Sequence, residues 1–429
     1  RRANDSRYIY SKTITIDADK MKLVHDENIA FTISVTDVAG NTTTLDNDNV
    51  TIHEENGYDQ VKYDGKAPKY KQLGVLNVDH LRNDEDVTVA KTGDEIRVLF
   101  HFDEILDVNP KMTIGESKTV YELKLVTDYE NFAEYTYMAD ITLTEDMNLS
   151  DGALVYTIYG YADAAGNVGK TIKSTDEIKT YTKFPGVRID NTKPGITVDK
   201  LNDNGYTNNG NVNIADASEF DVVVKIEGEV RHEYSNTKRA DLSWLGDGEY
   251  EIIVTDSAGN SNTIKFNLDT VAAKKHAVYL WANTESVVEN IDGKDYVVYY
   301  VTNGDVVTAT ISVNEILGEN PKFVIGYNGG SYEVPQDQVI FRELDDVEDF
   351  KYVYSAQITI PEDVKTENTE LTLTVYNVVD KAGNVTNNGE AIGISNVNRI
   401  FVDTTAPEIT LYKWFADGNH QVVEPSVHN

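Results

Sequence analysis

Hydrophobic and polar residues alternate with a period of two along many short stretches of the chain. In one of them, Leu371, Leu373 and Val375 alternate with threonines, and the stretches 264–268 and 354–360 repeat this pattern. Successive side chains of a strand point to opposite faces, so each stretch predicts a strand with one buried and one wet face. No stretch of ten or more residues shows a helical periodicity. The pattern therefore predicts an all-β fold.

A five-residue motif, Asp-x-Ala-Gly-Asn, occurs four times, at 37–41, 163–167, 256–260 and 380–384. Alternating stretches flank the third copy on both sides, which predicts a hairpin turn. Glycine supplies a positive φ, and the leading aspartate can accept backbone N–H bonds in an Asx turn. The alanine is expected to pack where a larger side chain would clash. The spacing of the copies alternates long, short, long, which indicates a repeat of two unlike units.

Matching segments confirm this repeat within the sequence itself. Residues 103–106 (Asp-Glu-Ile-Leu) match 314–317 (Asn-Glu-Ile-Leu), and 137–146 match 354–363. The shorter units share the pattern of residues 31–37 and 250–256. Regularly spaced strands with turn signals between them are typical of antiparallel β-sandwiches.

A second motif, Asp-x-x-x-Pro, follows the end of an alternating stretch at three places, and a fourth copy has lost its proline. We call these the joint segments, namely 64–68, 190–194, 269–273 and 403–407. Proline fixes φ and removes a backbone donor, so it ends a strand ladder and stiffens a junction. The joints divide the chain into five predicted domains: 1–66 (short, truncated at its start), 67–193 (long), 194–271 (short), 272–405 (long) and 406–429 (the start of another).

The short repeat, with Asp247-Gly248-Glu249-Tyr250 and the turn 256–260, resembles bacterial immunoglobulin-like (Ig-like) repeats. The joint 402–407 (Val-Asp-Thr-Thr-Ala-Pro) resembles them too, and the long repeat resembles a second, larger Ig-like type. Both types occur in large surface adhesins and in the stalks of wall-anchored enzymes. The resemblance implies tandem Ig-like β-sandwiches in an elongated, beads-on-a-string arrangement, although the Cys and Trp hallmarks of antibody domains are absent.

The chain is strongly acidic, with 38 Lys and Arg against 72 Asp and Glu and a net charge of −34. Such a charge disfavours nucleic acids and anionic membranes as partners, because binding to phosphates needs basic residues. The absence of cysteine excludes disulfides and thiolate chemistry. No apolar run reaches the length of a membrane span. Residues 1–5 lack the apolar core of a signal peptide, so we expect that none opens this sequence. We expect an internal fragment of an extracellular, surface-bound or secreted bacterial protein.

The sequence contains none of the common catalytic motifs, and none of its eight histidines recurs at an equivalent place in two repeats. Paired carboxylates carry little weight in so acidic a chain. We therefore expect no enzymatic activity from these residues.

The resemblance implies Ca²⁺ as the one candidate ligand, held by aspartates of the turns and joints. The candidates are Asp37, Asp163, Asp256 and Asp380 in the turns and Asp64, Asp190, Asp269 and Asp403 in the joints. Ca²⁺ takes six to eight oxygen ligands, so carbonyls and waters would complete each site. The alternative is that each aspartate only caps its own turn through backbone N–H bonds.

The sequence favours a non-catalytic structural or adhesive stalk that spaces or presents a distal binding module. Its expected partners are molecules on host or neighbouring cells, and self-association stays open. Two alternatives remain: the stalk of a large secreted cell-wall hydrolase, and a phage or filament decoration protein.

Overall fold

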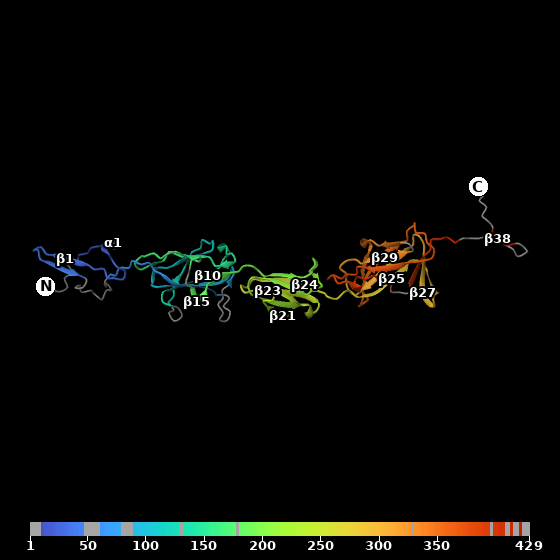
Figure 1. Ribbon diagram of the computed structural model, residues 1–429, viewed down its shortest axis with the longest axis horizontal. Helices are drawn as coiled ribbons and strands as arrows, with labels where there is room; N and C mark the ends of the chain where they lie inside the picture. Colours follow the sequence, from blue (N-terminus) through green and yellow to red (C-terminus); the bar gives the residue numbers. More distant parts are fainter. Residues whose placement is uncertain are drawn as a thin grey trace, which may run out of the picture. The chain divides into compact units, whose positions relative to one another are not determined.

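The computed structural model describes residues 10–46, 61–78, 89–127, 133–176, 180–327, 330–394, 398–407, 412–414 and 420–422 (Figure 1). About 50% of the described residues lie in strands and about 4% in helices, so the predicted all-β, sandwich-like fold is confirmed. Two compact units divide the chain. Unit 1 comprises residues 1–193 with Asp256–Asn260, and unit 2 comprises 194–255 with 261–429.

Unit 1 begins with a short helix and a hairpin. Helix α1 (Ala18–Met21) has Asp17 as its N-cap, and the hairpin joins β1 (Thr32–Thr36) to β2 (Thr42–Asp46). No described residue of 10–46 or 61–66 is buried. The described part of the predicted first domain thus contains no hydrophobic core.

The larger part of unit 1 is built from several small sheets. One has the order β15-β3-β5-β10-β9, another β14-β12-β7-β8, a third β11-β16-β4, and a fourth β13-β6. The strands are β3 (Tyr70–Asn77), β4 (Val89–Ala90), β5 (Glu95–Phe102), β6 (Leu106–Val108), β7 (Lys111–Ile114), β8 (Tyr121–Glu122), β9 (Lys124–Leu125), β10 (Thr136–Thr142), β11 (Gly152–Ala153), β12 (Tyr156–Tyr159), β13 (Ala162–Asp163), β14 (Ile172–Lys173), β15 (Thr180–Pro185) and β16 (Arg188–Ile189).

The core of unit 1 lies between these sheets. On β5, Ile96, Val98, Phe100 and Phe102 are all fully buried, as a period of two requires of one strand face. They pack with Met112, Ile114 and Ile158 from β7 and β12 of another sheet. Two facing sheets that share one apolar core are the defining feature of a sandwich.

The first part of unit 2 has two sheets, with orders β17-β19-β22 and β18-β24-β23-β20-β21. The strands are β17 (Gly195–Val198), β18 (Tyr206–Thr207), β19 (Asn211–Ala215), β20 (Phe220–Ile226), β21 (Glu229–Ser235), β22 (Arg239–Asp241), β23 (Gly248–Asp256) and β24 (Ser261–Leu268). Val212 and Ile214 of one sheet share a core with Val222, Ile252 and Phe266 of the other.

The second part of unit 2 has three four-stranded sheets, with orders β25-β28-β32-β31, β26-β27-β36-β33 and β30-β29-β34-β35. The strands are β25 (Lys275–Ala282), β26 (Ser286–Ile291), β27 (Lys294–Val301), β28 (Val306–Val313), β29 (Lys322–Tyr327), β30 (Gly330–Glu333), β31 (Ile340–Glu343), β32 (Tyr352–Thr359), β33 (Thr369–Glu370), β34 (Thr372–Tyr376), β35 (Ile392–Gly393) and β36 (Asn398–Val402). Leu371, Leu373 and Val375, predicted to face inward, are buried in its core. Near the end of the chain β37 (Tyr412–Trp414) pairs with β38 (His420–Val422).

The strands are not all antiparallel, which differs from the expectation. β4 pairs in parallel with β16, β18 with β24, and β27 with β36. In each pair an early strand of a hydrophobic cluster meets a late strand that runs in the same direction. A parallel pair needs a long connection, which the intervening strands supply. The three cores span 73–189, 198–268 and 273–402, whereas the five-domain division stays a prediction.

Candidate metal centre

Each leading aspartate of the four turns accepts hydrogen bonds from its own turn. In the fourth copy Asp380 Oδ1 accepts the N–H groups of Ala382 and Asn384, both at 2.9 Å, and Oδ2 accepts Asn384 Nδ2 at 2.8 Å. The bonds from the asparagine recur at Asp37, Asp163 and Asp256. The bond from the N–H two residues on, which defines an Asx turn, is present at Asp37, Asp256 and Asp380. The Asx-turn interpretation is thus confirmed for these three copies.

The other features of the turn vary between copies. The predicted hairpin is complete in the first and third copies, where β1–β2 and β23–β24 flank the turn. In the second and fourth copies a single bridge closes it, Ala162 with Val168 and Val379 with Val385. The alanine is buried at Ala258 and Ala382, but Ala39 and Ala165 are exposed, so the expected tight packing holds in two copies only.

The asparagine that ends each turn also connects the turn to a joint segment. Asn167 Nδ2 donates to the Asp64 carbonyl at 3.0 Å, and Asn384 Nδ2 donates to the Asp269 carbonyl at 2.8 Å. In unit 1, Asn260 Nδ2 donates to the Asp190 carbonyl at 2.8 Å. The turn and joint motifs therefore form one repeated structural element, which we call the turn–joint contact.

Two of these contacts gather three carboxylates each. In unit 1, Asp64, Glu104 and Asp163 place one oxygen each within 4.8 Å of the others. In unit 2, Asp269, Glu315 and Asp380 do the same. We call these the first and second acidic trios. Within unit 1, carboxylate oxygens of Asp190 and Asp256 also lie within 4.8 Å of one another.

The glutamates were missed among the sequence candidates, although the matching Glu-Ile-Leu segments carried a signal for them. Two interactions position Glu315, and the same two position Glu104 in the other long repeat. Lys274 N–H donates to Asn314 Oδ1 at 2.6 Å, as Lys69 N–H does to Asp103 Oδ1 at 2.8 Å. A β-bridge also pairs Leu317 with Asp380, as β6 pairs with β13 in unit 1. The joint, the Glu-Ile-Leu segment and the turn therefore meet at one point.

Burial and the neighbouring carboxylates disfavour the ionised form of the glutamate in each trio. Burial, followed by repulsion from Asp269 and Asp380, raises the pKa of Glu315 to about 7. Burial also raises the pKa of Glu104, with Asp64 and Asp163 as further causes. A bound cation would reverse the sign of these interactions. Carboxylates at this spacing are the ligands that hard cations such as Ca²⁺ prefer.

The first trio has a neighbour that the second lacks among its described contacts. His25 Nδ1 lies 3.0 Å from Asp64 Oδ1, and the histidine offsets a small part of the rise in the pKa of Glu104. The remaining sequence candidates, Asp37 and Asp403, join no acidic group among the described residues.

In the described part of the chain, no helix is long and apolar enough to cross a membrane.

No family model and no curated protein matches the chain. Among solved structures, dimeric latent PorU from Porphyromonas gingivalis matches at 12% identity with a TM-score of 0.17. The match covers 78% of this chain, and the chain spans 34% of the length of that one. A TM-score this low carries no argument about fold or function.

Proposed function

We propose that this chain is a non-catalytic structural and adhesive segment of an extracellular bacterial protein, built from tandem Ig-like modules that space or present a distal binding region. Its expected partners are molecules on host or neighbouring cells. The observation that carries the proposal is the turn–joint contact. It occurs at three joints with the same donor, the same acceptor and distances of 2.8 to 3.0 Å.

A spacer needs short linkers whose ends are fixed, because a free linker lets neighbouring modules reorient. Each turn–joint contact attaches a linker carbonyl to a turn that is held by the body of a module. A hydrogen bond of this type contributes about 0.5–1.5 kcal/mol to the stability of the folded state. That is enough to restrict a short linker that already contains proline, as at Pro68 and Pro194.

We propose Ca²⁺ as the ligand of the turn–joint contacts. The Asx bonds and a metal do not exclude one another, since each carboxylate oxygen has more than one acceptor position. In the second trio, Asp380 Oδ1 already receives two N–H groups. Glu315 and Asp269 therefore supply the more available oxygens, and water and carbonyl groups would complete the coordination.

Small-angle X-ray scattering of the full chain tests the spacer proposal. The triple variant Asn167→Ala, Asn260→Ala and Asn384→Ala removes the three amide donors to the joints. We expect an extended particle for the unchanged protein and a broader distribution of dimensions for the variant, because its linkers lose a fixed contact.

Asn41→Ala is the matched control for this experiment. Asn41 makes the same bonds to the aspartate of its turn, at 2.9 Å, yet no contact with a joint carbonyl is described for it. The control should scatter like the unchanged protein. A compact, single-body particle for the unchanged protein would contradict the proposal.

A further inference from the structure

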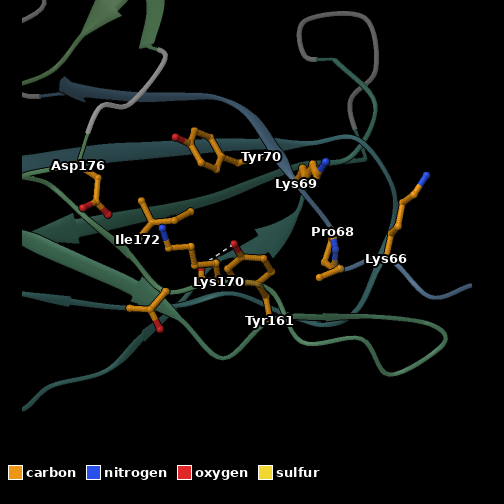
Figure 2. Close-up of a pocket in the computed structure, with 10 residues that line it drawn as sticks. Lys66, Pro68, Lys69, Tyr70, Tyr161, Lys170, Ile172 and Asp176 are labelled. Carbon is orange, nitrogen blue, oxygen red and sulfur yellow. Dashed lines mark hydrogen bonds between the residues drawn. The ribbon is translucent and has the colours of Figure 1, made fainter. Parts of the chain in front are cut away.

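A pocket of about 750 Å³ lies in unit 1, between the segment that follows Asp64 and the segment that follows the second turn (Figure 2). Its lining residues are Lys66, Ala67, Pro68, Lys69, Tyr70, Tyr161, Lys170, Thr171, Ile172 and Asp176. This volume falls within the range of about 300–1,000 Å³ that small-molecule sites occupy. The acidic trios do not contribute to it.

Aromatic rings form the inner part of the pocket. Tyr161 is buried and packs at 4.9 Å between ring centroids against Phe102, and Tyr70 stacks on Phe100 at 5.6 Å. The Tyr161 hydroxyl donates to the Lys170 carbonyl at 2.8 Å, as the dashed line in Figure 2 shows. These contacts fix both rings before any ligand arrives, which lowers the entropy cost of binding.

The other long repeat differs from this one beside the Tyr161 ring. There Thr386 is the counterpart of Gly169, since each backbone N–H donates at 2.9 Å to the carbonyl eight residues earlier, Val378 and Tyr161 respectively. The Thr386 side chain is buried and donates to the Ala273 carbonyl at 2.6 Å. A Cβ on Gly169 would instead lie 1.8 Å from a ring carbon of Tyr161. The first long repeat thus has Gly169 and the Tyr161 ring where the other repeat has a buried threonine bonded to the Ala273 carbonyl.

The charge of the pocket is opposite to that of the chain. Three lysines and one aspartate line it, in a protein of net charge −34. Lys66, Lys69 and Lys170 are exposed, and none of them forms an ion pair with another described residue. The Asp176 carboxylate accepts the backbone N–H of Lys173 at 2.8 Å instead. The ammonium groups are therefore available to an anion.

We propose that this pocket binds the carboxylate-bearing sugar ring of an acidic glycan. Lysine ammonium groups hold a carboxylate through charge-assisted hydrogen bonds. The half-buried ring of Tyr70 lines the pocket and offers apolar surface to the C–H face of a sugar ring. Pocket sites combine such surfaces with a few polar groups. An inorganic anion would use the lysines but would make no use of the aromatic part of the pocket. This inference goes beyond the spacing role and does not depend on it.

Titration calorimetry of the full chain tests the proposal, with glucuronic acid as the probe and glucose and inorganic phosphate as comparisons. We expect saturable binding of glucuronic acid, and binding of glucose and phosphate weaker by about tenfold or more. The variants Lys69→Gln and Lys170→Gln should each weaken glucuronic acid binding about tenfold, the loss expected for one charge-assisted contact. Lys124→Gln, an exposed lysine of β9 outside the pocket, should leave it unchanged.

Gly169→Ala provides a second test, because its Cβ would displace the Tyr161 ring and should abolish binding. The lysine variants still decide the question if this one fails to fold, since their side chains are exposed. Absence of glucuronic acid binding, equal binding of phosphate, or equal losses in Lys124→Gln and Lys170→Gln would overturn the proposal.

Discussion

Glu315 combines partial burial with two acidic neighbours, and it therefore makes the stability of its unit depend on pH. Its pKa is raised to about 7 chiefly by burial, from an ordinary value of 4.5. The folded chain therefore binds more protons than the unfolded chain between these two values. Protonated Glu315 therefore stabilises the folded state at pH 4.5 and below. This contribution to the free energy of unfolding is lost as the pH rises through 7.

Glu315→Gln should remove this pH dependence, because glutamine resembles the protonated glutamate in shape and cannot ionise. In cation-free buffer, we expect the melting temperature of the unchanged protein to fall more between pH 5 and pH 8 than that of the variant. Glu362→Gln, an exposed residue outside the trio, is the control and should behave like the unchanged protein. Parallel pH profiles for all three proteins would contradict the assigned role of Glu315.

At the scale of the elements, one side-chain bond recurs in the two long repeats. The hydroxyl of Tyr354 on β32 accepts the N–H of Leu317 at 2.8 Å, and Tyr137 on β10 accepts that of Leu106 at the same distance. Both tyrosines are buried. The bond holds the segment that carries the trio glutamate against a central strand. The same hydroxyl therefore supports both the packing on that strand and the position of the candidate site.

Tyr354→Phe should lower the free energy of unfolding by about 1–3 kcal/mol, because it leaves a buried N–H without an acceptor. Tyr376→Phe, at a position that is 40% exposed, is the matched control and should change it little. Differential scanning calorimetry of the full chain measures both. Equal transition temperatures for the two variants would show that the hydroxyl bond does not stabilise this repeat.

At the scale of the whole molecule, a net charge of −34 makes repulsion among carboxylates a general cost of folding. Cations held at the repeated turn–joint contacts would reduce this cost at several places in the chain. A cation that binds only the folded protein adds about 2.7 kcal/mol per site at a concentration 100 times its Kd.

Removal of divalent cations should therefore lower the melting temperature, and excess Ca²⁺ should restore it. The double variant Glu104→Gln and Glu315→Gln removes one carboxylate from each trio, so EDTA should shift its melting temperature less. Thermal unfolding followed by circular dichroism measures the effect. A melting curve that neither EDTA nor Ca²⁺ changes would exclude cation binding at these contacts.

The sequence by itself determined which side chains of a strand face the core. Alternation over two residues is a local property of an extended chain, so the burial of Leu371, Leu373 and Val375 needed no knowledge of the fold. The Asp-Gly-Asn chemistry of the turns is equally local, and Asp37, Asp256 and Asp380 have the predicted Asx bonds.

Only the tertiary structure decided which of these local elements meet. Glu104 and Glu315 join their trios because Leu106 pairs with Asp163 and Leu317 with Asp380, across more than fifty residues of chain. The pocket likewise depends on Tyr161 covering Gly169 beside a joint segment. Pairing of distant strands depends on how the apolar faces pack together, which no short stretch of sequence specifies.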